Sequence, residues 1–312
     1  MTHSPYLVAI APVQVQEYAA AVTDGGGKVE QLGSDVFGLV WTEHHAPDRL
    51  AEVLERNPQI KWVQLPFAGV ENFHSVFEWS ASRGRSIVFT SAKGAYREPV
   101  AEHALMLALA LARAIPERVK ANTWGSKFAA SLFDSNVIIV GGGGIAEELI
   151  RLLTPFRARI SVVRNHVRPM PGTAAVQDLS ALDVLLPKAD FVFLAAALTV
   201  ETKNLFDVER FCLMKPSAYL INVARGGIVN SADLEFALKN GLIAGAGVDV
   251  TNPEPLPDGH PLWTTPNLII TPHTADTPEI CLGLLSTRIK ANVQALVSGN
   301  ALDGQVNLEL GY

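Results

Sequence analysis

Three side chains that can bind an acid and move a proton follow short apolar runs in the second half of this 312-residue chain. Arg225 follows INVA, Glu254 lies in GVDVTNPEPLP, and His273 follows LIITP. A guanidinium binds a carboxylate through two parallel hydrogen bonds. An imidazole transfers a proton near neutral pH, and a neighbouring carboxylate raises its pKa and orients it. Each residue alone also fits an ordinary role, as a surface Arg, a loop Glu or a hydrogen-bonded His. Together they indicate acid–base chemistry on a bound carboxylate.

A glycine run, VGGGGIA, lies between an apolar strand pattern and a helical pattern. This context makes it a dinucleotide-binding fingerprint, because a helix N-terminus next to a tight turn holds a pyrophosphate. Gly141 permits the turn, Gly143 lets the backbone approach the ligand, and Ala146 is small enough for close helix–strand packing. The alternative is a flexible glycine-rich turn. The cofactor-binding residues predicted here are Gly141, Gly143, Gly144 and Ile145.

The next predicted strand runs into a basic cluster, ISVVRNHVRP. In an NAD site an acidic residue at the end of this strand holds the ribose 2′-hydroxyl, whereas an Arg accommodates the 2′-phosphate of NADP. Arg164 occupies that position, with Asn165, His166 and Arg168 beside it. We therefore predict NADP as the cofactor, with NADPH preferred over NADH. The alternative is a solvated basic loop.

The elements that must position these groups alternate between strand and helix, which is typical of α/β proteins with parallel sheets. A first series of strands is predicted over Tyr6–Ala11, Val36–Thr42, Ile60–Pro66 and Ser86–Ser91, with a helix over residues 46–58. A second series is predicted over Val137–Val140, Ile160–Val163, Phe191–Ala195, Tyr219–Val223, Ala246–Val250 and Leu268–Thr271. The sequence therefore predicts two doubly wound, Rossmann-like parallel sheets.

Two long helices are predicted, over residues 98–122 and 278–299. The first has Pro99 near its first turn and is apolar on most sides, so it must be buried in a core or against another subunit. We expect a homodimer with residues 101–116 at the interface.

Composition argues against several classes of protein. The chain is 48% hydrophobic and 18% charged, which argues against disorder, and its net charge of −6 argues against a nucleic-acid partner. Cys212 and Cys281 have no metal-ligand spacing, so we expect reduced thiols and no metal site. The segment MTHSPYLVAIAP lacks a signal-peptide pattern, and the apolar run over residues 104–112 is far shorter than the roughly 20 residues of a membrane span. We expect a cytoplasmic protein with no membrane partner.

Four segments resemble the signatures of the D-isomer-specific 2-hydroxyacid dehydrogenase family, in the same order: VGGGGIA, LMKPSAYLINVARGGIVN, GAGVDVTNPEPLPDGHPLW and NLIITPHTA. The resemblance covers nearly the whole chain and is weakest over the first 60 residues. Within the family, the chain resembles the NADPH-preferring, glyoxylate/hydroxypyruvate reductase-like branch. It implies a cofactor domain inserted into a split substrate domain. The expected division is residues 1–97 and 290–312 for the substrate domain and 98–289 for the dinucleotide-binding domain.

The resemblance also implies roles for the candidate residues. Arg225 would hold the substrate carboxylate, helped by backbone amides near Ala68 and Gly69. His273 would be the acid/base and Glu254 its partner. The implied reaction reduces a small 2-oxo acid to the D-2-hydroxy acid, with glyoxylate, hydroxypyruvate and bulkier acids all open as substrates. The further cofactor contacts implied are Val223 and Asp249, with Asp249 near the nicotinamide carboxamide.

Some positions depart from the family pattern, but none is one of the three catalytic candidates: Pro99, Ala146, Arg164, Ala197 and Val200. Two alternatives stay open. One is a non-catalytic, nicotinamide-sensing binding protein on the same fold. The other is formate dehydrogenase, which carries Gln at the position of Glu254 because formate oxidation needs no proton donor.

Overall fold

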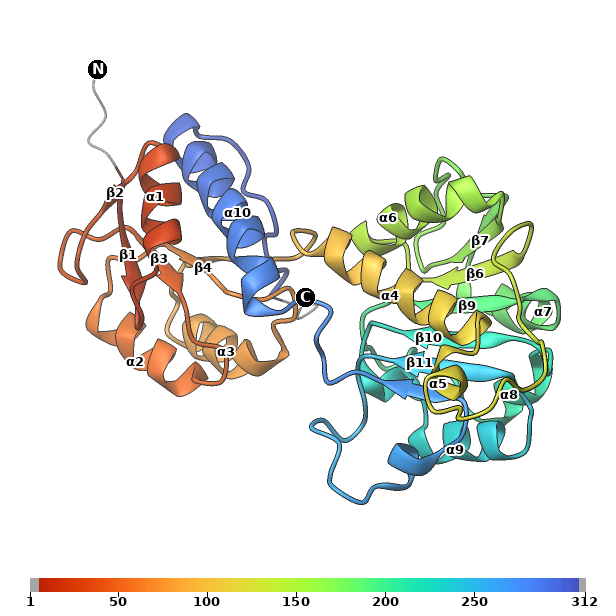
Figure 1. The fold of residues 1–312 in the computed structure, drawn as a ribbon. Coiled ribbons are helices and arrows are strands. Elements are labelled where there is room, and N and C mark those ends of the chain that lie inside the picture. The colour runs from red at the N-terminus through yellow and green to blue at the C-terminus, as the bar shows by residue number, and fades with distance from the viewer. Residues whose placement is uncertain (1–5, 309–312) are drawn as a thin grey trace. The chain divides into compact units, whose positions relative to one another are not determined.

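The computed structural model describes residues 6–308, so the ends of the predicted substrate domain, residues 1–5 and 309–312, lie outside the described residues. The chain divides into two compact units. One unit contains the chain up to Tyr96 together with the segment from Thr277 onward, and the other contains Arg97–Asp276. Each unit is built around its own parallel sheet (Figure 1). The predicted α/β class is confirmed.

The first unit has a five-stranded sheet in the order β2-β1-β3-β4-β5. Its core lies between the sheet and the helices α2 and α3, where Trp41 and Leu50 are fully buried. On the other side of the unit, α1 packs along α10. The strands are β1 Leu7–Ala11, β2 Lys28–Val29, β3 Gly38–Trp41, β4 Trp62–Gln64 and β5 Val88–Thr90, and the helices are α1 Gln16–Asp24, α2 Pro47–Arg56, α3 His74–Ser82 and α10 Pro278–Ser298.

The second unit has a seven-stranded sheet in the order β12-β11-β10-β9-β6-β7-β8. Since β6 starts the series and lies beside β9, the strand order reverses between these two strands. A ligand of an open α/β sheet binds at the carboxyl ends of the strands at such a reversal. The strands are β6 Asn136–Val140, β7 Arg159–Val163, β8 Ala175–Gln177, β9 Phe191–Leu194, β10 Tyr219–Asn222, β11 Gly245–Val248 and β12 Leu268–Ile270.

Helices cover both faces of this second sheet (Figure 1). On one face, α4 lies so close to β11 that a Cβ at Gly247 would be 3.0 Å from the Cβ of Leu107. On the other face, Val192 and Leu194 of β9 share a core with Phe211 and Leu234 from α8 and α9. The helices are α4 Arg97–Ala112, α5 Ile115–Arg118, α6 Gly144–Leu153, α7 Leu182–Leu185, α8 Val208–Leu213 and α9 Ser231–Lys239.

The helix predicted over residues 98–122 is shorter than expected. It ends at Ala112, because Ala114 has a left-handed backbone with a φ of 52° and Pro116 opens the separate short helix α5. Only one side of α4 is buried in its own unit, and Met106 on the other side is 43% exposed.

The point where the chain returns from the second unit to the first also differs from the expected boundary between residues 289 and 290. That boundary would cut α10, which is a continuous helix and belongs whole to the first unit. The helix is tied there by Asn292, whose buried side chain donates a hydrogen bond to Gln64 Oε1 of β4 at 2.9 Å. The chain therefore leaves the second unit at Asp276, just after the segment that carries His273.

Across residues 6–308, no helix combines the length and the apolar character needed to cross a membrane.

Candidate active site

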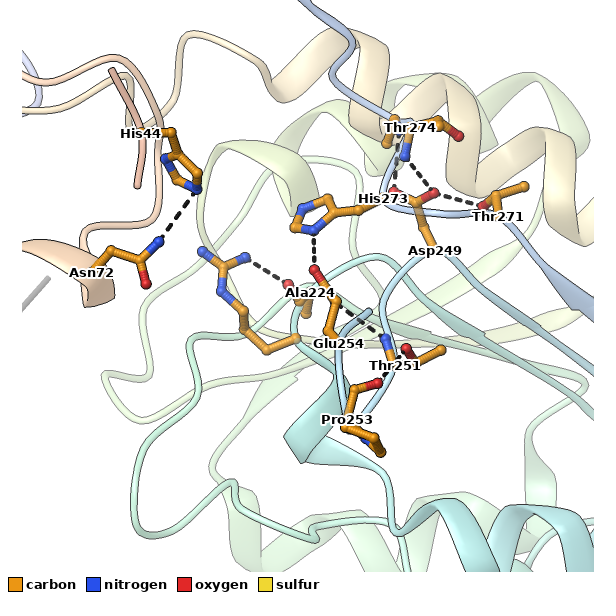
Figure 2. Close-up of polar contacts among 12 residues, drawn as sticks. His44, Asn72, Ala224, Asp249, Thr251, Pro253, Glu254, Thr271, His273 and Thr274 are labelled. Atoms are coloured by element: carbon orange, nitrogen blue, oxygen red, sulfur yellow. Dashed lines mark hydrogen bonds and ion pairs between the residues drawn. The ribbon is translucent and has the colours of Figure 1, made fainter. Parts of the chain in front are cut away.

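The structure brings Glu254 and His273 into direct contact (Figure 2). His273 Nδ1 lies 2.6 Å from Glu254 Oε1, and both side chains are about two-fifths exposed. The hydrogen bond that His273 donates to Glu254 raises the pKa of His273, and that effect outweighs the burial that opposes it. Burial raises the pKa of Glu254, but the hydrogen bond from His273 and the nearby Arg225 bring the net pKa below its usual value. The geometry therefore favours an imidazolium paired with a carboxylate.

The backbone at His273 is in an unusual conformation that aims the ring. Its φ of 52° lies in the left-handed region, which costs an L-residue about 1–2 kcal/mol. The amide of His273 donates hydrogen bonds to the carbonyls of Asp249 at 2.8 Å and Thr271 at 3.0 Å. Such strained residues persist where their surroundings fix them, and they are concentrated at functional sites.

Asp249 is the group that fixes these surroundings. Its side chain is 2% exposed and accepts hydrogen bonds from the amides of Thr274 at 2.9 Å and Ala275 at 3.1 Å. It also accepts one from the Thr271 hydroxyl at 2.6 Å (Figure 2). Burial by itself raises the pKa of Asp249, but these bonds and one from His103 lower it below its usual value. Asp249 is therefore an ionised carboxylate whose hydrogen bonds hold the loop that carries His273.

Arg225 follows β10 in a segment held close to the Glu254 loop. A Cβ at Gly226 would lie 1.9 Å from the carbonyl oxygen of Thr251, so only glycine allows this approach. The backbone carbonyl of Arg225 accepts a hydrogen bond from Asn222 Nδ2 at 3.0 Å, and its own Nη1 donates to Ala224 O at 2.7 Å. The contact between the two loops places the guanidinium in the same strand-end region as Glu254.

The glycine turn after β6 lies at the reversal of strand order. Gly141 has a φ of 110°, and a Cβ on it would lie 2.3 Å from the carbonyl oxygen of Ala195 at the end of β9. Gly143 is the N-cap residue just before α6, and a Cβ there would meet nothing within 4 Å. The turn is thus tight against the sheet on one side and open at the helix N-terminus on the other. This shape fits a pyrophosphate.

Arg164 lies against this turn. A Cβ on Gly142 would be 2.7 Å from the Cδ and Nε atoms of Arg164, so the side chain fills the space that the glycine leaves. Its Nη1 is 3.5 Å from the Met170 sulfur, and its Nε is buried with no hydrogen-bond partner among residues 6–308. A buried guanidinium nitrogen without a partner fits an absent anionic group. Asn165, His166 and Arg168 are exposed, and their contact with a cofactor stays a prediction.

The profile of the family described as "D-isomer specific 2-hydroxyacid dehydrogenase, NAD binding domain" matches residues 104–275, more than half of the chain. The chain belongs to this family. The predicted family is confirmed, and with it an enzyme that transfers hydride between a nicotinamide cofactor and a 2-hydroxy or 2-oxo acid.

Three similar proteins show how far the likeness extends. An uncharacterised protein from the proB 3′ region of Corynebacterium melassecola is 34% identical over 95% of this chain and 97% of its own length. The glyoxylate reductase/hydroxypyruvate reductase of Mus musculus is 33% identical over 75% of this chain and 74% of its own. A D-isomer specific 2-hydroxyacid dehydrogenase from Xanthobacter autotrophicus Py2, solved in complex with NADPH and MES, has a TM-score of 0.80 at 25% identity, over 99% of this chain and 100% of its own.

The remaining predicted site residues of this 2-hydroxyacid dehydrogenase lie in several places. Gly144 and Ile145 form the start of α6, and Val223 is buried after β10. Ala68 and Gly69 belong to the first unit, after β4, and their contact with a substrate stays a prediction.

Sequence reasoning missed two residues near His273. His103, on α4, is bonded to Thr271 and Asp249, and no local motif indicated this because 168 residues separate His103 from Thr271. Burial raises the pKa of Asp276, and the charge of Asp249 adds to that rise although His273 opposes it. Its place three residues after His273 was the one available signal.

Proposed function

We propose that this protein is an NADPH-preferring reductase that converts a small 2-oxo acid, such as glyoxylate or hydroxypyruvate, to the D-2-hydroxy acid. The observation that carries the proposal is the pair formed by His273 Nδ1 and Glu254 Oε1 at 2.6 Å, held in the same strand-end region as Arg225. A reductase of this class needs a proton donor and a carboxylate-binding cation close together, and these three residues meet both needs.

His273 is the proton donor in this proposal. Because Nδ1 is bonded to Glu254, Nε2 is the ring nitrogen that gives its proton to the substrate oxygen as negative charge develops there. Glu254 holds the ring in place and keeps it protonated before the reaction. The nicotinamide cofactor, when bound at the glycine turn, supplies the hydride.

Arg225 binds the substrate carboxylate and orients the 2-oxo group toward His273. The charge of Arg225 also helps keep Glu254 ionised. The pocket for the rest of the substrate then decides which 2-oxo acid reacts best.

NADPH preference is supported by the place of Arg164. Its guanidinium lies over Gly142 of the glycine turn, and its buried Nε has no partner in residues 6–308. A 2′-phosphate would supply the missing acceptor, whereas the 2′-hydroxyl of NADH is a neutral and weaker one. The Xanthobacter dehydrogenase, to which this chain is similar, was solved in complex with NADPH.

A homodimer is part of the same proposal. The exposed side of α4 is apolar at Met106, and the segment after it exposes further large apolar side chains, with Trp124 91% exposed and Val119 74% exposed. Exposed apolar groups gathered in one stretch of chain are typical of a protein–protein interface.

The test measures loss of absorbance at 340 nm with NADPH and, separately, with NADH, against glyoxylate, hydroxypyruvate, pyruvate and larger 2-oxo acids. We expect turnover of at least one acid, with a kcat/KM at least 10-fold higher for NADPH. Turnover of formate with NAD⁺ and no reductase activity would favour the formate dehydrogenase alternative. NADPH binding by calorimetry without turnover of any acid would favour the binding protein.

A further inference from the structure

We propose that His103 is a positioning residue for His273, acting through Thr271 and Asp249. This inference rests on the proposed function, since it assigns a role to His273 as proton donor. The two histidines lie on different elements of the same unit, α4 and the loop after β12.

The contacts of His103 are with two groups that already hold the loop. Its Nε2 lies 2.9 Å from the Thr271 hydroxyl and 3.3 Å from Asp249 Oδ1. The contact between His103 and Asp249 is largely shielded from water, since the His103 side chain is 15% exposed and the Asp249 side chain is 2% exposed. A polar contact shielded from water in this way is stronger and more directional than one on the surface.

The direction of each hydrogen bond follows from the number of protons available. An ionised Asp249 only accepts, so the single hydroxyl proton of Thr271 is donated to Oδ1 at 2.6 Å. The hydroxyl oxygen can then only accept from His103, so His103 Nε2 must carry a proton. His103 is thereby fixed as a donor to both Thr271 and Asp249.

The same carboxylate binds the loop on the far side of His273. Asp249 Oδ1 and Oδ2 accept from the amides of Thr274 and Ala275, the two residues that follow His273. Thr271, two residues before it, is held by its hydroxyl. The loop is therefore fixed on both sides of the left-handed residue by one carboxylate, and His103 fixes that carboxylate from α4.

Removal of the His103 donor frees the Thr271 hydroxyl and Asp249 Oδ1 to move. The carboxylate loses one of its four donors while it stays buried. The loop then no longer holds the His273 ring firmly against Glu254. Small errors in the position of a catalytic group cost about 100-fold in rate for a misplacement of about 1 Å.

The test compares His103→Leu, which keeps the size but removes the donor, with His103→Gln, which returns an amide N–H close to the Nε2 position. The first readout is steady-state reduction of the best 2-oxo acid by NADPH. We expect His103→Leu to lower kcat about 10- to 100-fold with the KM for NADPH within a few-fold. His103→Gln should retain at least a third of wild-type kcat.

The second readout is the pKa of His273, measured by NMR from its side-chain nitrogen shifts, with the resonance assigned from its absence in His273→Gln. This pKa depends on the bond to Glu254 and on the nearby Asp249 and Asp276, so it reports ring position. We expect it to fall in His103→Leu and to stay at the wild-type value in His103→Gln. A residue that only supports the fold would change the melting temperature without changing this pKa.

A matched pair at Thr271 tests the connection. Thr271→Val removes the hydroxyl and Thr271→Ser keeps it. If His103 acts through Thr271, the loss in His103→Leu with Thr271→Val is smaller than the product of the two single losses. An unchanged His273 pKa and multiplicative losses would overturn the proposal. If the wild type reduces no 2-oxo acid, the proposed function fails, and the NMR comparison still decides the positioning role.

Discussion

His273 Nδ1 and Glu254 Oε1 meet at 2.6 Å although 19 residues separate them in the chain. The loop after β11 carries the carboxylate, and the loop after β12 carries the imidazole. Since β11 and β12 are neighbouring parallel strands, their loops emerge at the same edge of the sheet. In the proposed function, this pairing leaves Nε2 as the nitrogen that transfers a proton.

His273→Ala should lower kcat for 2-oxo acid reduction by about 10²–10⁴, because the proton donor is lost. The Kd for NADPH should change only a few-fold, since the glycine turn and Arg164 are on other loops. Steady-state kinetics and fluorescence titration with NADPH check the two expectations. A variant that retains a tenth of wild-type kcat would show that His273 is not the donor.

The reduction rate should depend on pH through His273. The reaction needs the protonated ring, so kcat/KM is full below the pKa of His273 and falls as pH rises through it. Glu254 raises that pKa, so Glu254→Gln should move the falling limb to lower pH and reduce the maximum rate. The measurement is kcat/KM from pH 5 to 10 for both proteins. A limb at the same pH in both would mean that Glu254 does not control the proton.

Arg164→Asp should reverse the cofactor preference. A carboxylate would repel the 2′-phosphate, and loss of one charge-assisted hydrogen bond of about 1.5–3 kcal/mol reduces NADPH binding roughly 10- to 150-fold. The kcat/KM for NADH should stay the same or rise. Arg168→Ala is the comparison variant, because Arg168 is an exposed cation of the same segment. Equal use of both cofactors by the wild type would show that the basic segment around Arg164 is only a solvated loop.

Gly226→Ala should destabilise the second unit, because the added Cβ would lie 1.9 Å from the Thr251 carbonyl oxygen. Overpacking of this kind costs about 1–3 kcal/mol in the free energy of unfolding. The melting temperature should fall by several degrees, and activity should fall with it as Arg225 moves. Gly227→Ala is the matched control, because the nearest atoms to its Cβ would belong to the Leu198 side chain, at 3.1 Å, and not to the backbone. Equal melting temperatures for the two variants would contradict this account.

The protein should be a homodimer at micromolar concentration. Light scattering coupled to size exclusion should give twice the 33.5 kDa chain mass. Met106→Glu should shift the protein toward the monomer, because the dimer would bury the new charge at the interface on the side of α4 that is exposed in the single chain. Glu98→Lys, which changes a charge at the start of the same helix, is the control. A wild type of 33.5 kDa would refute the interface.

Much of the fold could be predicted because its signals are local. The strand runs, the glycine turn and the position of Arg164 each depend on residues within a few positions of one another. The same reasoning overextended α4, since the left-handed Ala114 is not evident from an apolar run. It also misplaced the return to the first unit, because the buried bond between Asn292 and Gln64 joins residues 228 positions apart.

The sequence by itself determined the α/β class, the family, and the chemical groups available at the strand ends. Only the tertiary structure decided which of those groups meet. In the tertiary structure, Glu254 pairs with Nδ1 of His273 and the Arg164 side chain packs against Gly142. His103, on a helix distant in sequence, lies beside Asp249. The physical reason is that a hydrogen bond requires atoms within about 3 Å in a fixed direction. Side-chain types and spacing along the chain set neither the distance nor the direction; the packing of the sheet and its helices sets both.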